Sequence, residues 1–178
     1  MKLIPIPKDK YEEYRQTLMF DCYKWDPQFL DHNTIARYAL VLTEEEHAEV
    51  SAYTEALDKE TRAAEQLINS DLSLAKPLGL PRNVRRDIAR MTNYDPDRHI
   101  RLTRYDFHPT AEGEWAVSEV NSDVPGGFAE SSLLPEEVKK VLPAGNYYFK
   151  NFGETLVKAI SSKVKKGGRI MLVHCTCY

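Results

Sequence analysis

Hydrophobic residues recur at helical spacing near the start of the chain and again before its middle. Over 8–20, Tyr11, Tyr14 and Leu18 follow one another at intervals of three and four residues, which predicts an amphipathic helix with these side chains inward. The sequence Thr43-Glu-Glu-Glu46 is a capping box, and the helix that it begins is expected to run to about Ser70.

Three further helices are predicted from the same periodicity and from proline and glycine signals. Pro81 suits the first turn of a helix that continues over 83–91. A short helix is expected over 128–134, stopped by Pro135. The last covers 151–166 and ends at a Gly-Gly pair; its inward residues are predicted to be Phe152, Leu156, Val157 and Ile160.

Four segments have the composition or alternation of strands. The range 100–108 is rich in β-branched and aromatic residues, and 114–121 alternates in hydrophobicity. The range 36–42 is expected to be either a short strand or the lead-in to the next helix, and the apolar run 169–174 predicts a buried strand. The fold class is therefore α+β or α/β, with mixed helices, an antiparallel hairpin, and the start of a further α/β unit over 151–178.

The segments 100–108 and 114–121 are separated by a turn-rich stretch, so they predict a hairpin. If Glu112 and Gly113 form the tight turn, Asp106 lies opposite Glu119 and Arg104 lies opposite Asn121. Because side chains alternate along a strand, these four share one face. The opposite face is expected to be the core face and carries Tyr105, Phe107, Ala116 and Val120.

Two carboxylates directly across a ladder repel each other, so this face favours a nearby cation. Either a divalent metal or Arg104 supplies that charge, and Mg²⁺ prefers a few carboxylate or carbonyl oxygens together with phosphate oxygens. A solvated hairpin face with a surface ion pair explains the same pattern, and spacing alone leaves both interpretations open. Gly126 and Gly127 form either a phosphate-binding nest or a plain tight turn, and their place after the hairpin favours the nest.

The hairpin resembles the metal-binding hairpin of the circularly permuted ATP-grasp ligases, of which the glutathionylspermidine synthase-like proteins are members. The matching positions are Arg104, Asp106, Glu119, Asn121 and Asp123. The resemblance implies that Asp106, Glu119 and Asn121 hold Mg²⁺ bridging the phosphates of ATP. It implies that Arg104 contacts the substrate carboxylate or its acyl phosphate. The chain departs from the family pattern at 124–127, so the acid and the amine stay undefined.

The resemblance is strong over 104 to about 132 and weaker at the final strand. The length of 178 residues predicts a single domain or one domain plus a fragment, and the resemblance implies the N-terminal portion of a larger ligase. The metal- and phosphate-binding part is expected to be the hairpin and glycine loop over 100–132. The implied activity is ATP-dependent C–N bond formation from a small-molecule carboxylate and an amine. A non-catalytic binding or assembly domain with an incomplete ATP-grasp site is the alternative.

Composition limits the other functional classes. The hydrophobic fraction of 42% and the charged fraction of 29% are ordinary for a folded protein, and the net charge of −3 makes no overall case for nucleic acid. No apolar run approaches the length needed to span a bilayer, so no membrane partner is expected. The three cysteines make no disulfide framework, and the cytoplasm is the simplest compartment.

Three other groups of residues are weaker candidates for a functional site than the hairpin. His174, Cys175 and Cys177 are soft zinc ligands but lack a second ligand pair at finger spacing. A nucleophile pair of Cys22 and His32 lacks any motif around the cysteine. The arginines of 82–90 suit phosphates, but a solvated helix face is the more common explanation, since no RNA-binding signature accompanies them.

Overall fold

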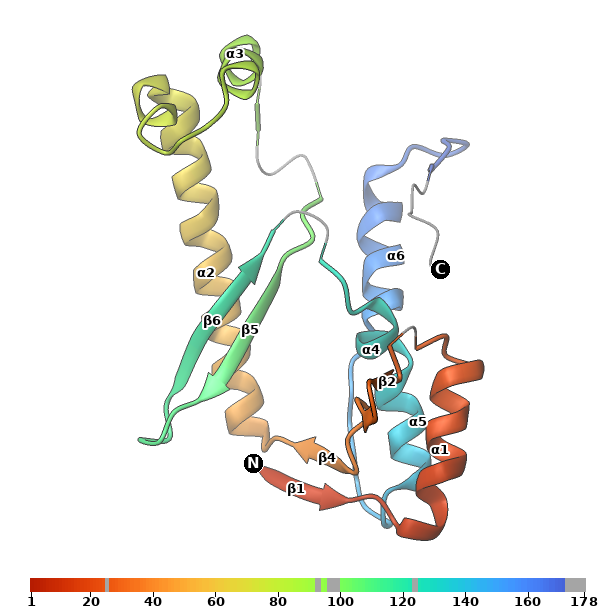
Figure 1. The fold of residues 1–178 in the computed structure, drawn as a ribbon. Coiled ribbons are helices and arrows are strands. Elements are labelled where there is room, and N and C mark those ends of the chain that lie inside the picture. The colour runs from red at the N-terminus through yellow and green to blue at the C-terminus, as the bar shows by residue number, and fades with distance from the viewer. Residues whose placement is uncertain (25, 92–93, 96–99, 123–124, 172–178) are drawn as a thin grey trace. The chain divides into compact units, whose positions relative to one another are not determined.

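The computed structural model describes residues 1–24, 26–91, 94–95, 100–122 and 125–171 (Figure 1). The described chain is a mixed α+β protein, in agreement with the coarse fold class predicted above. Its helices are α1 (Lys8–Phe20), α2 (Glu44–Ser70), the 3₁₀-helix η1 (Leu72–Ala75), α3 (Arg82–Arg90), α4 (Phe128–Ser132), α5 (Leu134–Val141) and α6 (Phe152–Lys163). Its strands are β1 (Lys2–Pro5), β2 (Gln28–Phe29), β3 (His32–Asn33), β4 (Tyr38–Val41), β5 (Arg104–Pro109) and β6 (Trp115–Asn121).

The strands form three antiparallel pairs within the described part of the chain, β1 with β4, β2 with β3 and β5 with β6. The chain divides into two compact units. The first unit combines 1–43 with the chain from 126 onward, and the second unit is 44–125. The hairpin and the glycine loop, which the sequence groups together, therefore belong to different units.

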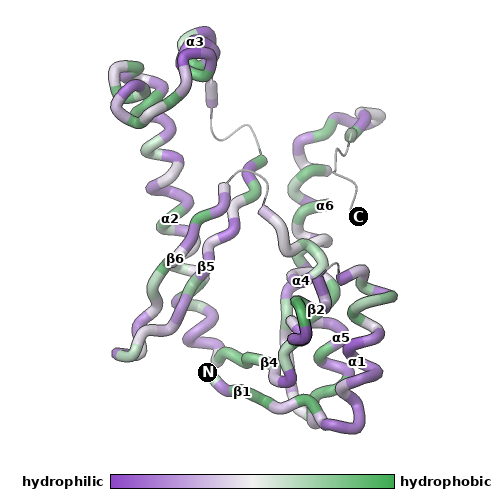
Figure 2. The backbone as a smooth tube through the Cα atoms, in the orientation of Figure 1, coloured by the Kyte–Doolittle hydropathy of each residue, from purple (hydrophilic) through white to green (hydrophobic). Residues whose placement is uncertain are grey.

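The first unit has a hydrophobic core centred on α1, which packs against α5. As predicted, Tyr11, Tyr14 and Leu18 face inward, and Leu18 is fully buried. The Tyr11 hydroxyl donates a hydrogen bond of 2.7 Å to the carbonyl oxygen of Ile35, which ties the helix to the segment before β4. Figure 2 shows the corresponding mixture of hydrophobic and hydrophilic positions along α1.

The second unit consists of a long helix, a basic helix and the β5–β6 hairpin. Helix α2 covers 27 residues, close to the predicted span, and none of them is buried. The 3₁₀-helix η1 packs against both α2 and α3, and it supplies Ala75, which is fully buried. None of the described helices combines the length and the apolarity that a membrane span requires.

Several local predictions are wrong. Pro135 does not stop a helix but lies in the first turn of α5, where its missing amide hydrogen costs nothing. Val157 is 64% exposed rather than inward. Residues 169–171 form no strand, and the rest of the predicted strand, 172–174, lies outside the described residues.

Candidate functional site

The β5–β6 hairpin brings together the four residues that the sequence singles out. Arg104 pairs with Asn121, and Asp106 pairs with Glu119, in the predicted register. The two pairs are successive rungs on one face of the hairpin, since side chains at i and i+2 share a face. The sequence therefore placed an arginine, two carboxylates and an amide correctly relative to one another.

The predicted register occurs without the tight turn that was expected to produce it. The connection is a longer loop, in which the Thr110 amide donates to the Glu114 carbonyl at 2.7 Å and Gly113 adopts a positive φ of 85°. A β-bulge then shifts the register between Asp106 and Phe107, and Ser118 is the extra residue of β6. The loop and the bulge offset each other by one residue, so the rungs at Asp106 and Arg104 are unchanged.

The bulge changes the opposite face of the hairpin. Ala116 pairs with His108, so alternation puts it on the Asp106 side, and the prediction that it belongs to the core face is wrong. Val117 takes that place opposite Phe107. The face is also not fully covered, because Val117 is 39% exposed and Val120 is 44% exposed.

Arg104 grips Asp106 with two parallel contacts. Its Nε lies 2.8 Å from Oδ1, and its Nη2 lies 3.2 Å from Oδ2. The same Nη2 lies 3.9 Å from Oε1 of Glu119, so one guanidinium lies near both carboxylates and offsets part of their negative charge. This is the surface ion pair that the sequence left open as an alternative to metal. Because all three side chains are substantially solvated, such a pair contributes only about 0–1 kcal/mol to stability.

The oxygen donors on this face are of the kind that Mg²⁺ accepts. Asp106, Glu119 and Asn121 offer two carboxylates and one amide carbonyl, which fits an ion that completes its shell with water and phosphate oxygens. No cluster of three or more His, Cys, Asp and Glu within the described residues is placed to hold a metal. The expected set has only two such residues plus the amide, so its metal binding stays a prediction.

Two buried hydroxyl groups, one just before β5 and one within it, have no hydrogen bond in the described part of the chain. Thr103 Oγ1 and the Tyr105 hydroxyl are buried, and neither has a hydrogen-bond partner among the described residues. A buried hydroxyl without a partner destabilises the folded state by roughly 1–3 kcal/mol. The start of the hairpin therefore carries an energetic cost at these two hydroxyls.

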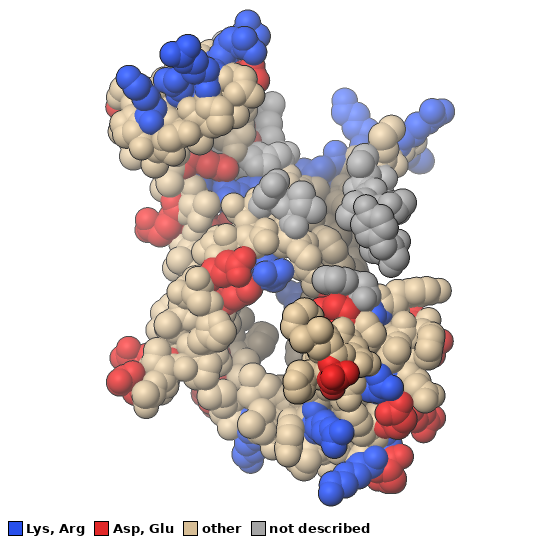
Figure 3. Space-filling model, viewed as in Figure 1, with Lys and Arg blue, Asp and Glu red and all other residues tan. Residues whose placement is uncertain are grey.

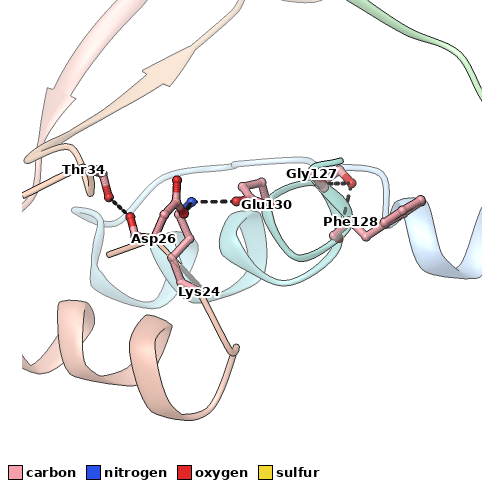
Figure 4. Close-up of polar contacts among 7 residues, drawn as sticks. Lys24, Asp26, Thr34, Gly127, Phe128 and Glu130 are labelled. Atoms are coloured by element: carbon pink, nitrogen blue, oxygen red, sulfur yellow. Dashed lines mark hydrogen bonds and ion pairs between the residues drawn. The ribbon is translucent and has the colours of Figure 1, made fainter. Parts of the chain in front are cut away.

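The glycine loop begins helix α4 in the first unit. Gly127 has a φ of 94° and forms the N-cap, and its carbonyl oxygen accepts hydrogen bonds from the Ser131 amide at 2.9 Å and hydroxyl at 2.7 Å (Figure 4). A Cβ atom at Gly127 would meet nothing within 4 Å, so the backbone conformation, not space, requires glycine here.

A half-buried lysine that the sequence did not single out contacts the helix that follows this loop. Lys24 Nζ contacts Asp26 and lies 2.7 Å from Oε1 of Glu130 in α4 (Figure 4). Burial alone would lower the pKa of the Lys24 ammonium, but the hydrogen bonds to the two carboxylates outweigh it and raise the pKa. No periodicity connects Lys24 with Glu130 in the sequence, so only the fold reveals the pair.

Among the weaker candidates, the structure describes the Cys22 and His32 pair, whereas the zinc candidates lie outside the described residues. Cys22 is buried in the core of the first unit, and burial raises the pKa of its thiol, which disfavours a nucleophilic thiolate. His32 is exposed on β3. Asp123, His174, Cys175 and Cys177 lie outside the described residues.

The arginines of α3 form a basic cluster on the surface of the second unit. Arg82, Arg86 and Arg90 are exposed, and Figure 3 shows blue side chains gathered over this helix. The only acid in the helix is Asp87, which lies 3.7 Å from Arg86. The cluster is therefore a solvated basic surface, in line with the more common explanation of its sequence.

Comparison with known proteins adds no relative: no family model, curated protein or solved structure matches the chain.

Proposed function

We propose that this chain is part of an ATP-dependent carboxylate–amine ligase, with the β5–β6 hairpin as its metal- and substrate-binding element. The observation that carries the proposal is the pairing of Arg104 with Asn121 and of Asp106 with Glu119 on one face. This pairing puts the arginine, two carboxylates and amide of the resemblance on adjacent rungs. It supports the proposal because these groups match what phosphoryl transfer to a carboxylate needs.

In the proposed reaction a substrate carboxylate attacks the terminal phosphorus of ATP, ADP leaves, and an amine then displaces phosphate from the acyl phosphate. Bound Mg²⁺ would neutralise the phosphate oxygens during transfer. Asp106, Glu119 and Asn121 would hold that ion. Arg104 would grip the carboxylate and stabilise its developing charge, because a guanidinium presents a planar fork to two oxygens. The backbone amides of Gly126 and Gly127 belong to the first unit and would be a separate phosphate-binding element.

The ion pair between Arg104 and Asp106 gives the proposal a specific feature. Both carboxylate oxygens of Asp106 lie on the guanidinium, so Arg104 and a cation compete for Asp106. Release of Arg104 by the cation would free its fork for the substrate carboxylate. Metal affinity in the absence of nucleotide is therefore expected to be weak, and ATP should raise it by adding phosphate oxygens.

The alternative is a binding or assembly domain that turns nothing over, and the bidentate ion pair favours it. In that case Arg104 and Asp106 are partners for stability only. The two proposals differ in one measurable property, which is whether Mg²⁺ and ATP bind together at the hairpin.

Titration of the chain with Mn²⁺, followed by electron paramagnetic resonance with and without ATP, tests the proposal. Binding that strengthens with ATP is expected, and Asp106→Asn and Glu119→Gln should each weaken it at least about tenfold. Asp58→Asn is the matched control, because Asp58 also pairs with an arginine at 2.7 Å but lies on α2. Mn²⁺ binding that is absent, or that survives both hairpin substitutions, would contradict the proposed site.

A further inference from the structure

A cavity of 460 Å³ lies within the second unit, between α2 and the segments that enter and leave the hairpin. Its apolar wall consists of Ala64, Ile68, Ile100 and Leu102. Its polar lining includes Glu65 and Arg101. The volume is in the range of small-molecule sites, which are mainly apolar with a few polar groups that fix orientation.

Arg101 is the most informative residue of this cavity. Its side chain is only 10% exposed, and its Nη1 lies 2.9 Å from Oε2 of Glu65. A guanidinium has five N–H donors, and no other donor of Arg101 has a hydrogen bond to a described residue. A charged group with that little solvent normally has more of its donors satisfied, since the desolvation of an ion is costly.

Only one of the two carboxylate oxygens of Glu65 accepts hydrogen bonds from the described residues. Its Oε2 accepts hydrogen bonds from both Arg101 and the Tyr94 hydroxyl, each at 2.9 Å. Its Oε1 accepts none from the described residues, and the side chain is 34% exposed. Beside its aliphatic wall, the cavity therefore has guanidinium donors of Arg101 and the Oε1 acceptor of Glu65 available to a ligand.

We propose that this cavity binds a small zwitterion that carries an ammonium group, a carboxylate and an aliphatic side chain, as an aliphatic amino acid does. The carboxylate pairs with the free donors of Arg101, and the ammonium pairs with Oε1 of Glu65. The hydrocarbon chain packs on the apolar wall.

The net charge of the lining decides between ligand classes. A simple carboxylate would gain Arg101 but lie beside the Glu65 carboxylate, and a simple amine would lie beside the Arg101 guanidinium. Only a ligand with both charges satisfies both groups without like-charge repulsion. None of Arg104, Asp106, Glu119 and Asn121 lines the cavity, so this site does not depend on the proposed ligase function.

Three probes that differ by one group each test the zwitterion. Norvaline carries both charges, pentanoate lacks the ammonium and butylamine lacks the carboxylate. The readout is the methyl NMR shifts of Ile68, Ile100 and Leu102 in the whole chain. Norvaline is expected to move these signals at millimolar concentration, with each single-charge probe binding about tenfold more weakly or worse. No shift with norvaline, or equal affinity for either single-charge probe, would overturn the proposal.

Substitutions locate the binding. Arg101→Lys keeps the charge but loses the fork, and it should weaken norvaline binding severalfold. Ala64→Leu leaves both charged partners in place while filling the cavity, so it should abolish the shifts. Arg15→Gln is the matched control, because Arg15 pairs with Glu12 at 2.8 Å in the first unit. Asp106→Asn should leave norvaline binding unchanged, which separates failure of this site from failure of the metal site. Norvaline binding that is unaffected by both Arg101→Lys and Ala64→Leu would refute the assignment.

Discussion

At the scale of single residues, the hairpin face is organised by Arg104. Its guanidinium contacts Asp106 with two nitrogens and approaches Glu119, so it reduces a like-charge repulsion that the ladder itself creates. The pair is about one-third exposed, so its contribution to folding is small.

Substitution of Arg104 separates a role in binding from a role in stability. In the proposed full-length ligase, Arg104→Lys is expected to lower ATP turnover by about one to three orders of magnitude, because lysine supplies the charge without the fork. Arg104→Ala should lower the free energy of unfolding by less than about 1 kcal/mol. Both variants are measured for turnover and for urea unfolding. Full turnover in the lysine variant, or a large loss of stability in the alanine variant, would assign Arg104 to structure.

Tyr105 offers a second test at the same scale. Its buried hydroxyl has no hydrogen-bond partner among the described residues, so Tyr105→Phe removes an uncompensated polar group. The free energy of unfolding is expected to rise by about 1 kcal/mol. Tyr148→Phe, at a position that is 86% exposed, is the control and should change little. A marked loss of stability in Tyr105→Phe would mean that the hydroxyl has a partner in solution.

Tyr14 gives the core a pH dependence. Burial raises the pKa of Tyr14 from its ordinary value of 10.0 to about 12, with smaller contributions from Cys22 and Tyr11. The folded state thus favours the neutral phenol, so this stability is complete below about pH 10 and is lost as the pH rises toward 12. Two pKa units correspond to about 2–3 kcal/mol. Chemical unfolding across this range should show a shallower decline in Tyr14→Phe than in the natural chain, and equal slopes would contradict the assignment.

At the scale of elements, loops and caps decide where the functional groups lie. The loop after β5 and the bulge at Ser118 together preserve the rungs at Asp106 and Arg104. In the first unit, Gly127 begins α4 with a left-handed backbone. The tilted rings of Phe128 and Phe152, with centroids 5.5 Å apart, pack α4 against α6. The loop after β5 and the start of α4 each contain a glycine with a positive φ, Gly113 and Gly127.

The glycine loop contains its own matched pair of substitutions. Added Cβ atoms at Gly126 and Gly127 would both meet open space, but only Gly127 has a positive φ. Gly127→Ala should therefore lower the free energy of unfolding by about 1–2 kcal/mol, whereas Gly126→Ala should be close to neutral. Thermal unfolding of the two variants compares them directly. Equal effects would show that the φ of Gly127 is not what requires glycine.

At the scale of the whole molecule, the buried hydrophobic residues are unevenly distributed. Within the described chain, the core cluster of Ile6, Tyr11, Tyr14, Leu18, Cys22 and Ile35 lies entirely in the first unit. The second unit buries Ala75, while its α2 buries nothing completely. Its hairpin is a two-stranded sheet, which is marginally stable unless other elements cover it.

This distribution predicts that the two units open at different free energies. Amide hydrogens of α1 and α5 should exchange slowly with deuterium, while those of β5 and β6 should exchange faster by at least about tenfold. Peptide-resolved mass spectrometry after deuterium labelling measures both in one sample. Leu18→Ala should accelerate exchange in α1 and α5 more than in the hairpin. Equal protection of both units in the natural chain would contradict the prediction.

The sequence by itself determined the helices with strong periodicity, the inward face of α1 and the pairing of Arg104, Asp106, Glu119 and Asn121. These features follow from local rules, since period and alternation fix which residues share a face. It also predicted the coarse fold class. Its errors at Pro135, Ala116 and Val157 arose where one residue of register or neighbouring packing changes the outcome.

Only the tertiary structure decided which charged groups meet. Lys24 and Glu130 are 106 residues apart, and Glu65 and Arg101 are 36 apart, so no local pattern links either pair. The structure also shows that both oxygens of Asp106 contact Arg104, whereas metal binding at this face stays a prediction. The physical reason is that local periodicity fixes the direction of a side chain, whereas its partners depend on which distant segments the packing brings within hydrogen-bond distance.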